Sequence, residues 1–169
     1  LYANWNITND LLFITTLGVD VRNKRWGYYC SAYSLDGEGK DSKSLKEHTI
    51  ESGITWENVL TYSKILGEHD FQIMGGTSTI YKSKDYTLAS GIGKTYGGII
   101  YHNLASNTKE VMIDSYLNEE KLASFFGRVN YKFMDRYILT ASLRADGSSL
   151  LADGHKWGYF PSVAVAWRM

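Results

Sequence analysis

The sequence has little proline, one cysteine and no long apolar run. Only Pro161 occurs among 169 residues, and a scarcity of proline suits a chain built from hydrogen-bonded strands. The lone Cys30 excludes an internal disulfide framework and leaves the redox compartment, and its own role, undetermined. No stretch approaches the ~18 apolar residues that a transmembrane helix needs. Helical membrane proteins and disulfide-stapled secreted domains are therefore excluded.

The charge balance also excludes a class of partner. Eighteen basic residues face eighteen acidic ones, so electrostatics give no case for binding nucleic acid. The N-terminus begins at Leu1 without an initiator Met or a signal-peptide pattern. We therefore expect the chain to be mature, processed or cut from a longer protein.

Aromatic residues, by contrast, are abundant. The chain has 13 Tyr and 5 Trp, and its aromatic fraction is 14%. Tyr and Trp favour places where one end of the ring is dry and the other is wet, such as a membrane interface. The 16 glycines suit strands and turns.

Apolar and polar residues alternate most clearly over residues 136–146. Tyr137, Leu139, Ala141, Leu143 and Ala145 share one parity, while five of the six residues of the other parity are polar. Successive strand side chains point to opposite faces of a sheet. A run of ~10 residues with this alternation is typical of a strand in a transmembrane β-barrel, although the pattern alone does not say which face is outside.

The same reading predicts seven strands and a regular alternation of their connections. The expected strands are 3–8, 11–22, 55–63, 71–80, 122–133, 136–146 and 157–168. Their connections run short, long, short, long, short and medium, as they do where short periplasmic turns alternate with long extracellular loops. A soluble β-domain with an aromatic core would explain the alternation of side chains but not the alternation of loops.

We therefore interpret residues 1–169 as part of a single all-β domain, an antiparallel transmembrane β-barrel. An open sheet edge would leave backbone groups unpaired in lipid, so seven strands suggest a segment of a larger barrel. The plug domain and the remaining strands are not recognisable in the chain. Long extracellular loops are expected at about 23–54 and 81–121.

Segment 124–168 contains a series of specific motifs: Phe126-Gly127-Arg128-Val129-Asn130-Tyr131, Asp135-Arg136-Tyr137, Arg144-Ala145-Asp146-Gly147-Ser148-Ser149, Lys156-Trp157-Gly158-Tyr159-Phe160-Pro161-Ser162 and Ala166-Trp167-Arg168. With these motifs the chain resembles the SusC/RagA family of TonB-linked outer-membrane transporters of Bacteroidetes. The likeness spans nearly the whole chain and is weak in the two long loops. One departure is that Leu150 and Leu151 stand where the family commonly has a basic and aromatic pair. The loop that follows the Asp-Gly-Ser-Ser motif is therefore altered here.

The resemblance implies a plugged barrel of about 22 strands in the cell outer membrane. It implies import of a glycan or oligopeptide, with TonB acting through the plug region and a SusD-like lipoprotein at the extracellular mouth. Outer-membrane lipid would surround the wall, and neither an enzymatic activity nor a cofactor is implied. A soluble carbohydrate-binding or adhesive surface domain is the alternative. Substrate identity and oligomeric state do not follow from the sequence.

Candidate ligand-binding residues come from the polar parity and from the predicted loops. We expect Arg128, Asn130, Arg144 and Asp146 to face the lumen, where they contact substrate or pair with each other or the plug, and Val129, Leu139, Leu143, Val163 and Val165 to face outward. The loop residues Tyr96, Tyr101 and Tyr116 could stack on sugar rings or pack the loops together.

No motif predicts a catalytic or metal site. Gly93-Lys94-Thr95 lacks the upstream glycine of a P-loop, since Leu88 occupies that position. The four histidines are too far apart for ligand spacing, and no nucleophile elbow is present. The acidic, Gly-rich residues 36–41 could offer oxygen ligands to Ca²⁺, but they lack the ordered spacing of an EF-hand loop.

Overall fold

The computed structural model describes residues 1–37, 40–93 and 99–169, and these form strands with two short 3₁₀ helices. The strands are β1 (Tyr2–Asn6), β2 (Leu11–Cys30), β3 (Lys43–Leu66), β4 (His69–Ile92), β5 (Lys109–Phe133), β6 (Tyr137–Ser148) and β7 (Trp157–Trp167), and the 3₁₀ helices are η1 (Leu35–Gly37) and η2 (Leu104–Ser106). Among the described residues, no helix is both long and apolar enough to span a membrane.

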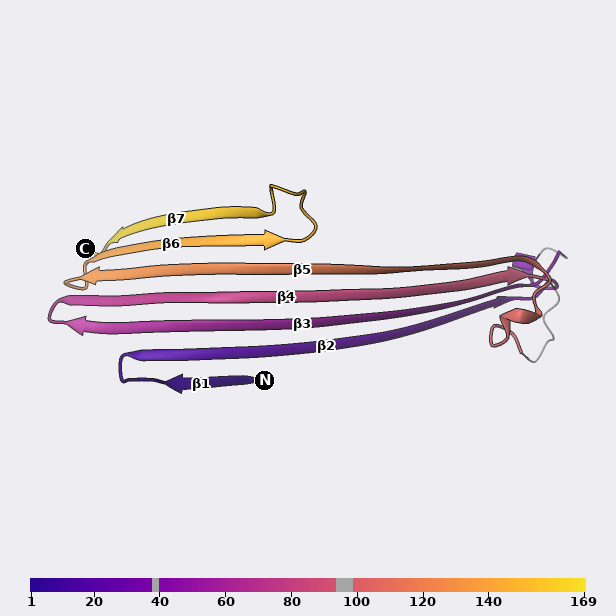
Figure 1. The fold of residues 1–169 in the computed structure, drawn as a ribbon, viewed down its shortest axis with the longest axis horizontal. Coiled ribbons are helices and arrows are strands. Elements are labelled where there is room, and N and C mark those ends of the chain that lie inside the picture. The colour runs from indigo at the N-terminus through magenta and orange to yellow at the C-terminus, as the bar shows by residue number, and fades with distance from the viewer. Residues whose placement is uncertain (38–39, 94–98) are drawn as a thin grey trace. The chain divides into compact units, whose positions relative to one another are not determined.

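The seven strands lie side by side in the order in which they occur in the chain, as Figure 1 shows. Neighbouring strands at the β7 edge are antiparallel: β5 pairs with β6 from Leu122 opposite Ser148 to Phe133 opposite Tyr137, and β6 pairs with β7 from Tyr137 opposite Trp167 to Gly147 opposite Trp157. The sequence prediction of seven antiparallel strands joined in order is confirmed.

Two connections are tight turns of the kind that β-hairpins favour. Gly67 has a positive φ of 61° between β3 and β4, and Met134 and Asp135 have φ values of 51° and 55° between β5 and β6. Positive φ at the centre of a two-residue loop matches the twist of the strands on either side. The turn expected at Met134-Asp135 is therefore present.

The predicted long loops are largely strand, and this part of the sequence interpretation is wrong. Segments 23–54 and 81–121 contain the ends of β2 and β4 and the beginnings of β3 and β5. Only residues 31–42 and 93–108 connect these strands. The reason is that residues such as Lys46, Glu47 and Glu51 place charge along the strand without an apolar face, so the period-two signal of a half-buried strand is missing.

The described residues form two compact units, and the four long strands contribute to both. Unit 1 comprises Leu1–Asp20, Gly53–Lys82 and Glu120–Met169, and unit 2 comprises Val21–Ser52 and Ser83–Glu119. Unit 1 contains β1, β6, β7 and part of each long strand, whereas unit 2 contains the remaining parts of β2, β3, β4 and β5.

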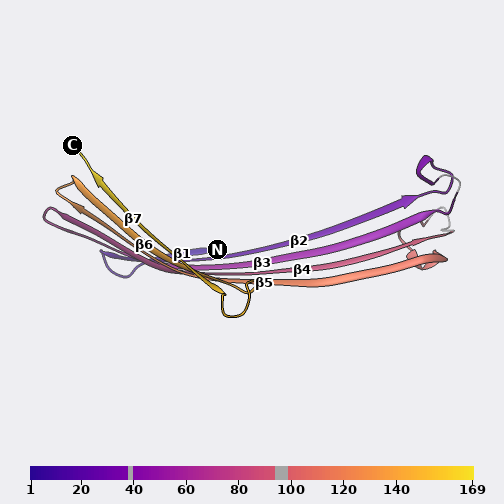
Figure 2. The same cartoon turned by 90° about the horizontal axis from the view of Figure 1, so that it is seen from above.

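Each unit is a single layer of sheet, as Figure 1 and Figure 2 show. Cys30 is the only buried hydrophobic residue among the described ones. Many large apolar side chains are exposed instead, including Val163 at 71% and Val165 at 78%. A water-soluble domain buries such residues, so this sheet needs an apolar environment against one of its faces.

Candidate functional site: the two faces of the sheet

The register of β5, β6 and β7 separates unit 1 into an apolar and a polar face. Residues directly opposite each other on neighbouring strands share a face. Val129 lies opposite Ala141, which lies opposite Val163, and Leu139 lies opposite Val165. Leu143 follows on the same parity of β6. The five residues predicted to share one face therefore do so.

Aromatic side chains gather on this apolar face beside the two tight turns. Phe71 and Tyr131 stack with their ring centroids 4.8 Å apart, His69 lies 4.9 Å from Phe133, and Phe133 lies 6.4 Å from Tyr137. The His69 ring also makes a hydrogen bond of 2.7 Å with the Tyr131 hydroxyl. These aromatic side chains thus form a contiguous cluster, with polar tips next to apolar ring faces.

The opposite face carries the predicted lumenal residues. Arg128 lies opposite Ser142, which lies opposite Ser162, and Asn130 lies opposite Thr140. Arg144 lies opposite Phe126 on one side. Asp146 lies two residues from Arg144 on β6, so Arg128, Asn130, Arg144 and Asp146 share one face, as predicted.

Arg144 and Asp146 form an ion pair with each other. The Arg144 Nε donates to both carboxylate oxygens of Asp146 at 2.8 and 2.9 Å, and one terminal nitrogen donates to Ser124 Oγ at 3.1 Å. The guanidinium also lies 5.7 Å from the centre of the Phe126 ring. For these two candidates the structure favours a mutual pairing over a free ligand contact.

Asn130 also belongs to a hydrogen-bonded row on this face. Its amide donates to Gln72 at 3.0 Å and accepts from the Thr140 hydroxyl at 2.9 Å. Lys132 pairs with Asp70 at 2.9 Å in the neighbouring row. A shallow polar hollow lies over these residues.

Arg128 differs from its neighbours. Among the described residues it makes no hydrogen bond, ion pair or ring contact, and its side chain is exposed. Lys132, Arg144 and Lys82 on the strands around it each have a carboxylate partner. Of the four lumenal candidates, Arg128 is the one whose charge is available to a ligand.

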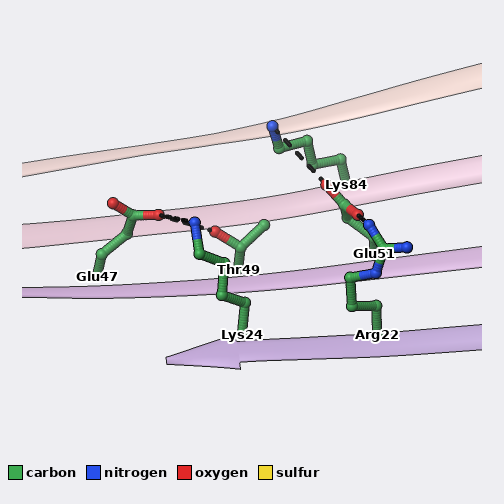
Figure 3. A network of polar contacts seen from close by, with 6 residues as sticks. All are labelled: Arg22, Lys24, Glu47, Thr49, Glu51 and Lys84. Atoms are coloured by element: carbon green, nitrogen blue, oxygen red, sulfur yellow. Dashed lines mark hydrogen bonds and ion pairs between the residues drawn. The ribbon is translucent and has the colours of Figure 1, made fainter. Parts of the chain in front are cut away.

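In unit 2 one face carries a network of ion pairs across three strands, drawn in Figure 3. Glu51 on β3 forms ion pairs with Arg22 of β2 at 3.3 Å and with Lys84 of β4 at 3.9 Å. Lys24 lies 3.7 Å from Glu47, which also accepts a hydrogen bond from Thr49. Charge pairing thus joins β2, β3 and β4 where an apolar face is missing.

Buried polar contacts hold the outer ends of the unit 2 strands together. Ser44 is 2% exposed and exchanges hydrogen bonds of 2.9 and 2.7 Å with the side chain of Asn107. Lys109 donates to Asp41 at 2.7 Å, and this hydrogen bond, followed by the charge of Asp41, raises the pKa of Lys109. The C-terminal end of the 93–108 connection and the start of β5 are therefore fixed to the start of β3 and to the residues just before it.

The three tyrosine candidates have different surroundings. The Tyr101 ring lies over Gly27, where an added Cβ would approach it to 2.3 Å, and it contacts the His102 ring at 4.5 Å. Tyr116 belongs to β5 rather than to a loop, and it stacks on Tyr86 at 4.8 Å. Burial, and after it the charge of Glu47, raises the pKa of Tyr86. Tyr96 lies outside the described residues.

The chemistry available for catalysis or metal binding is limited. No group of three or more His, Cys, Asp or Glu side chains comes together in the part of the chain that the structure describes. The acidic segment 36–41 and the sequence Gly93-Lys94-Thr95 each lie partly outside the described residues.

The sequence analysis did not identify Phe160 as a residue of the polar face. It lies opposite Arg144 on the polar face, and its side chain is 57% exposed. Its signal was its parity, because Phe160 alternates with the neighbours that form the apolar face, Tyr159 and Pro161. The other residues of this parity on β7 are small, namely Gly158, Ser162, Ala164 and Ala166, so the large ring of Phe160 differs from them.

Comparison with known proteins decides the family. No protein-family profile matches the chain. The TonB-dependent receptor P3 of Formosa agariphila is 34% identical over 168 residues, which are 99% of this chain and 17% of the relative. The TonB-dependent receptor SusC of Bacteroides thetaiotaomicron is 31% identical over 116 residues, which are 69% of this chain and 11% of that receptor. The chain belongs to the SusC/RagA family of TonB-dependent receptors.

Solved structures agree on the fold of this SusC/RagA chain. The RagAB peptide transporter superposes on 96% of this chain with a TM-score of 0.85 at 21% identity, and its open-open state does so with a TM-score of 0.86. The superposed part is 18% of the solved chain. The chain thus spans about a sixth of the length of its relatives and corresponds to part of a barrel.

Proposed function

We propose that this chain forms part of the barrel wall of an outer-membrane importer. The observation that carries the proposal is a single-layer sheet whose large apolar side chains are exposed on one face, with Cys30 as the only buried hydrophobic among the described residues. Lipid is the environment in which such a face is stable. The likeness to TonB-dependent receptors supports this environment.

In this arrangement the apolar face of unit 1 contacts lipid and the polar face lines the interior. The face with Val129, Leu139 and Val163 has no charged member on β6. Turning it inward would place Arg128 and Arg144 in hydrocarbon, at a cost of ~2–4 kcal/mol for each cation near the midplane. The polar rows of Asn130 and Arg144 suit a water-filled lumen or a plug that fills it.

The long strands extend beyond the membrane. A tilted strand crosses it with ~9–11 residues, whereas β3 and β4 each have 24. We assign unit 2 and the 31–42 and 93–108 connections to the extracellular side, because the connections on that side are the long ones. There they would meet a SusD-like lipoprotein and the arriving substrate, while TonB would act through the plug region.

The transported substrate is a glycan or an oligopeptide. The solved RagAB structure is that of a peptide transporter, and at 21% identity it shares only the fold with this chain. The stacked pair of Tyr86 and Tyr116 in unit 2 offers ring faces that suit either kind of ligand.

The alternative of a soluble carbohydrate-binding or adhesive surface domain is less well supported. Such a domain would need a second layer to cover Val163, Val165 and their neighbours, and each described unit has only one. Behaviour in solution distinguishes the two readings. A soluble domain stays monodisperse without detergent, whereas a barrel segment requires detergent or its neighbouring strands.

The experiment that tests the proposal shortens the 93–108 connection in the full-length receptor to a two-residue turn. We expect growth on the transported substrate to fall while the barrel remains folded, as shown by its heat-modifiable mobility on a gel. Replacing the Met134-Asp135 turn with Asn-Gly serves as the control at the opposite end of β5 and should leave growth unchanged. Normal uptake after the shortening would show that this connection is a passive cover.

A further inference from the structure

We propose that the polar face of unit 1 carries a binding patch for carboxylate groups of the transported substrate, formed by Arg128, Ser142, Phe160 and Ser162. This inference rests on the proposed function, since it supposes that substrate passes this face of the wall. We call these four residues the carboxylate patch.

The register brings the four residues together. Arg128, Ser142 and Ser162 lie directly opposite one another on β5, β6 and β7. Phe160 is two residues from Ser162 on the same strand and therefore on the same face. Ser142 and Phe160 are diagonal neighbours on adjacent strands, ~7–8 Å apart. Arg128 lies one strand further away, and the Phe160 ring lies over Gly158, so a ligand that contacts both Arg128 and Phe160 spans the row of Ser142 and Ser162.

Arg128 is the anion-binding group of the carboxylate patch. Its neighbour Arg144 is already held by Asp146 and Ser124, whereas Arg128 has no partner among the described residues. A guanidinium forms two parallel hydrogen bonds to a carboxylate, and this geometry makes Arg the preferred residue for such groups. The hydroxyls of Ser142 and Ser162 provide donors on the same row of the sheet.

Asp146 does not cancel this positive charge. It lies two rows from Arg128 along β6, because Arg128 is opposite Ser142, and Arg144 stands between them. Both carboxylate oxygens of Asp146 accept from Arg144 Nε. One Arg and one Asp thus neutralise each other, and the second Arg supplies the net charge of this region.

Phe160 gives the carboxylate patch an apolar side. Its ring is 57% exposed on the polar face, and it lies opposite Arg144. A half-exposed ring stacks on the C–H face of a sugar or on an aliphatic side chain. The ligand that fits is a carboxylate joined to such an apolar surface, as in an oligouronate or an acidic peptide, and these two sources share the recognised chemistry.

The test compares charged and neutral probes on the purified full-length receptor. Binding is measured by calorimetry with a galacturonate oligomer against a neutral maltooligosaccharide, and with a glutamate-rich peptide against the matched glutamine peptide. We expect Arg128→Gln to lower the affinity of the receptor for the carboxylate probe that it binds by about 10-fold or more, because one charge-assisted contact is lost. The probe that responds identifies the source as uronate or peptide.

Two further variants separate a specific effect from a general one. Arg136→Gln removes the same charge from the exposed turn and should leave every affinity unchanged. Phe160→Leu should lower the affinity for the same probe as Arg128→Gln does. Because Phe160→Leu changes no charge, such a loss would show that ring stacking contributes to binding.

Three results would overturn the carboxylate patch. These are a wild-type receptor that binds neither carboxylate probe, an Arg128→Gln loss that is equal for charged and neutral probes, and an equal effect of Arg136→Gln. An equal loss for all probes would show that Arg128 ties the wall to another part of the receptor. Substrate import by the wild-type receptor is measured in parallel, since its absence would contradict the proposed function itself.

Discussion

The assignment of the apolar face to lipid predicts opposite outcomes for two neighbouring substitutions on β7. Val163 lies opposite Ala141 on the apolar face, and Ala164 lies opposite Thr140 on the polar face. Val163→Arg and Ala164→Arg therefore introduce the same charge at nearly the same position along the strand. We expect only Val163→Arg to impair folding into the membrane.

The magnitude follows from the depth of Val163. With a rise of ~3.4 Å per residue and a tilt of ~40°, each residue advances ~2.6 Å along the membrane normal. Val163 is four residues from Trp167, which lies opposite Tyr137 at the aromatic end of the sheet, so it lies ~10 Å inside an apolar band ~25 Å tall. This is near the midplane, where a lipid-facing Arg costs ~2–4 kcal/mol.

Little packing is lost at the same time, because the Val163 side chain is 71% exposed. The cost is therefore mainly that of placing the cation in lipid, and ~2–4 kcal/mol lowers the folding equilibrium by about 30- to 700-fold. Val165→Arg, at ~5 Å depth by the same geometry, should cost less, since the penalty falls to ~0–1 kcal/mol near the interface.

The assay is the fraction of heat-modifiable receptor recovered in the outer membrane, supported by urea titration in lipid vesicles. The expected order of destabilisation is Val163→Arg, then Val165→Arg, then Ala164→Arg with almost none. Equal losses for Val163→Arg and Ala164→Arg, or a larger loss for Ala164→Arg, would refute the assignment of the faces.

Two further predictions concern packing and charge. Gly76→Ala should destabilise the barrel by ~1–3 kcal/mol, because an added Cβ would meet the Phe126 ring at 2.5 Å and the Asn58 backbone oxygen at 2.7 Å. Gly75→Ala is the control: its nearest contact would be at 4.0 Å, so it should be neutral in the same urea titration. Glu51→Gln should lower the stability of unit 2 by at most ~1 kcal/mol at low salt and by nothing measurable in 1 M salt, since both of its ion pairs are partly exposed; a salt-independent loss in hydrogen exchange of β3 would contradict this.

The period-two pattern correctly predicted which side chains of the strands in unit 1 share a face. The alternation over residues 136–146 placed Leu139 and Arg144 on opposite faces, and the register of β5, β6 and β7 confirms that separation. The turn at Met134-Asp135 could also be predicted, because only these two residues lie between two alternating runs. These features depend only on neighbouring residues.

The missing part of the prediction has a physical cause. In the outer half of β3 neither face is apolar, and contacts between residues that are distant in sequence stabilise the strands of unit 2. Lys84 and Glu51 are 33 positions apart, and Ser44 and Asn107 are 63 apart. Such pairs leave no local period, so the sequence suggests loops where the structure has strands. The candidate site depended on the same non-local information, because Phe160 joins Arg128 only through the register of three strands.

Within unit 1 the side chains at the sequence limits 82 and 120 are of the kind found at a membrane–water interface. On the apolar face Lys121 lies 5.6 Å from the centre of the Tyr81 ring, and Trp56 donates to Thr15 at 3.1 Å. On the polar face Lys82 pairs with Glu120 at 3.9 Å. Lysine and amphipathic rings are the side chains that favour a membrane–water interface. Unit 1 therefore ends where the proposed lipid contact ends, and from there the same strands are held together by charge.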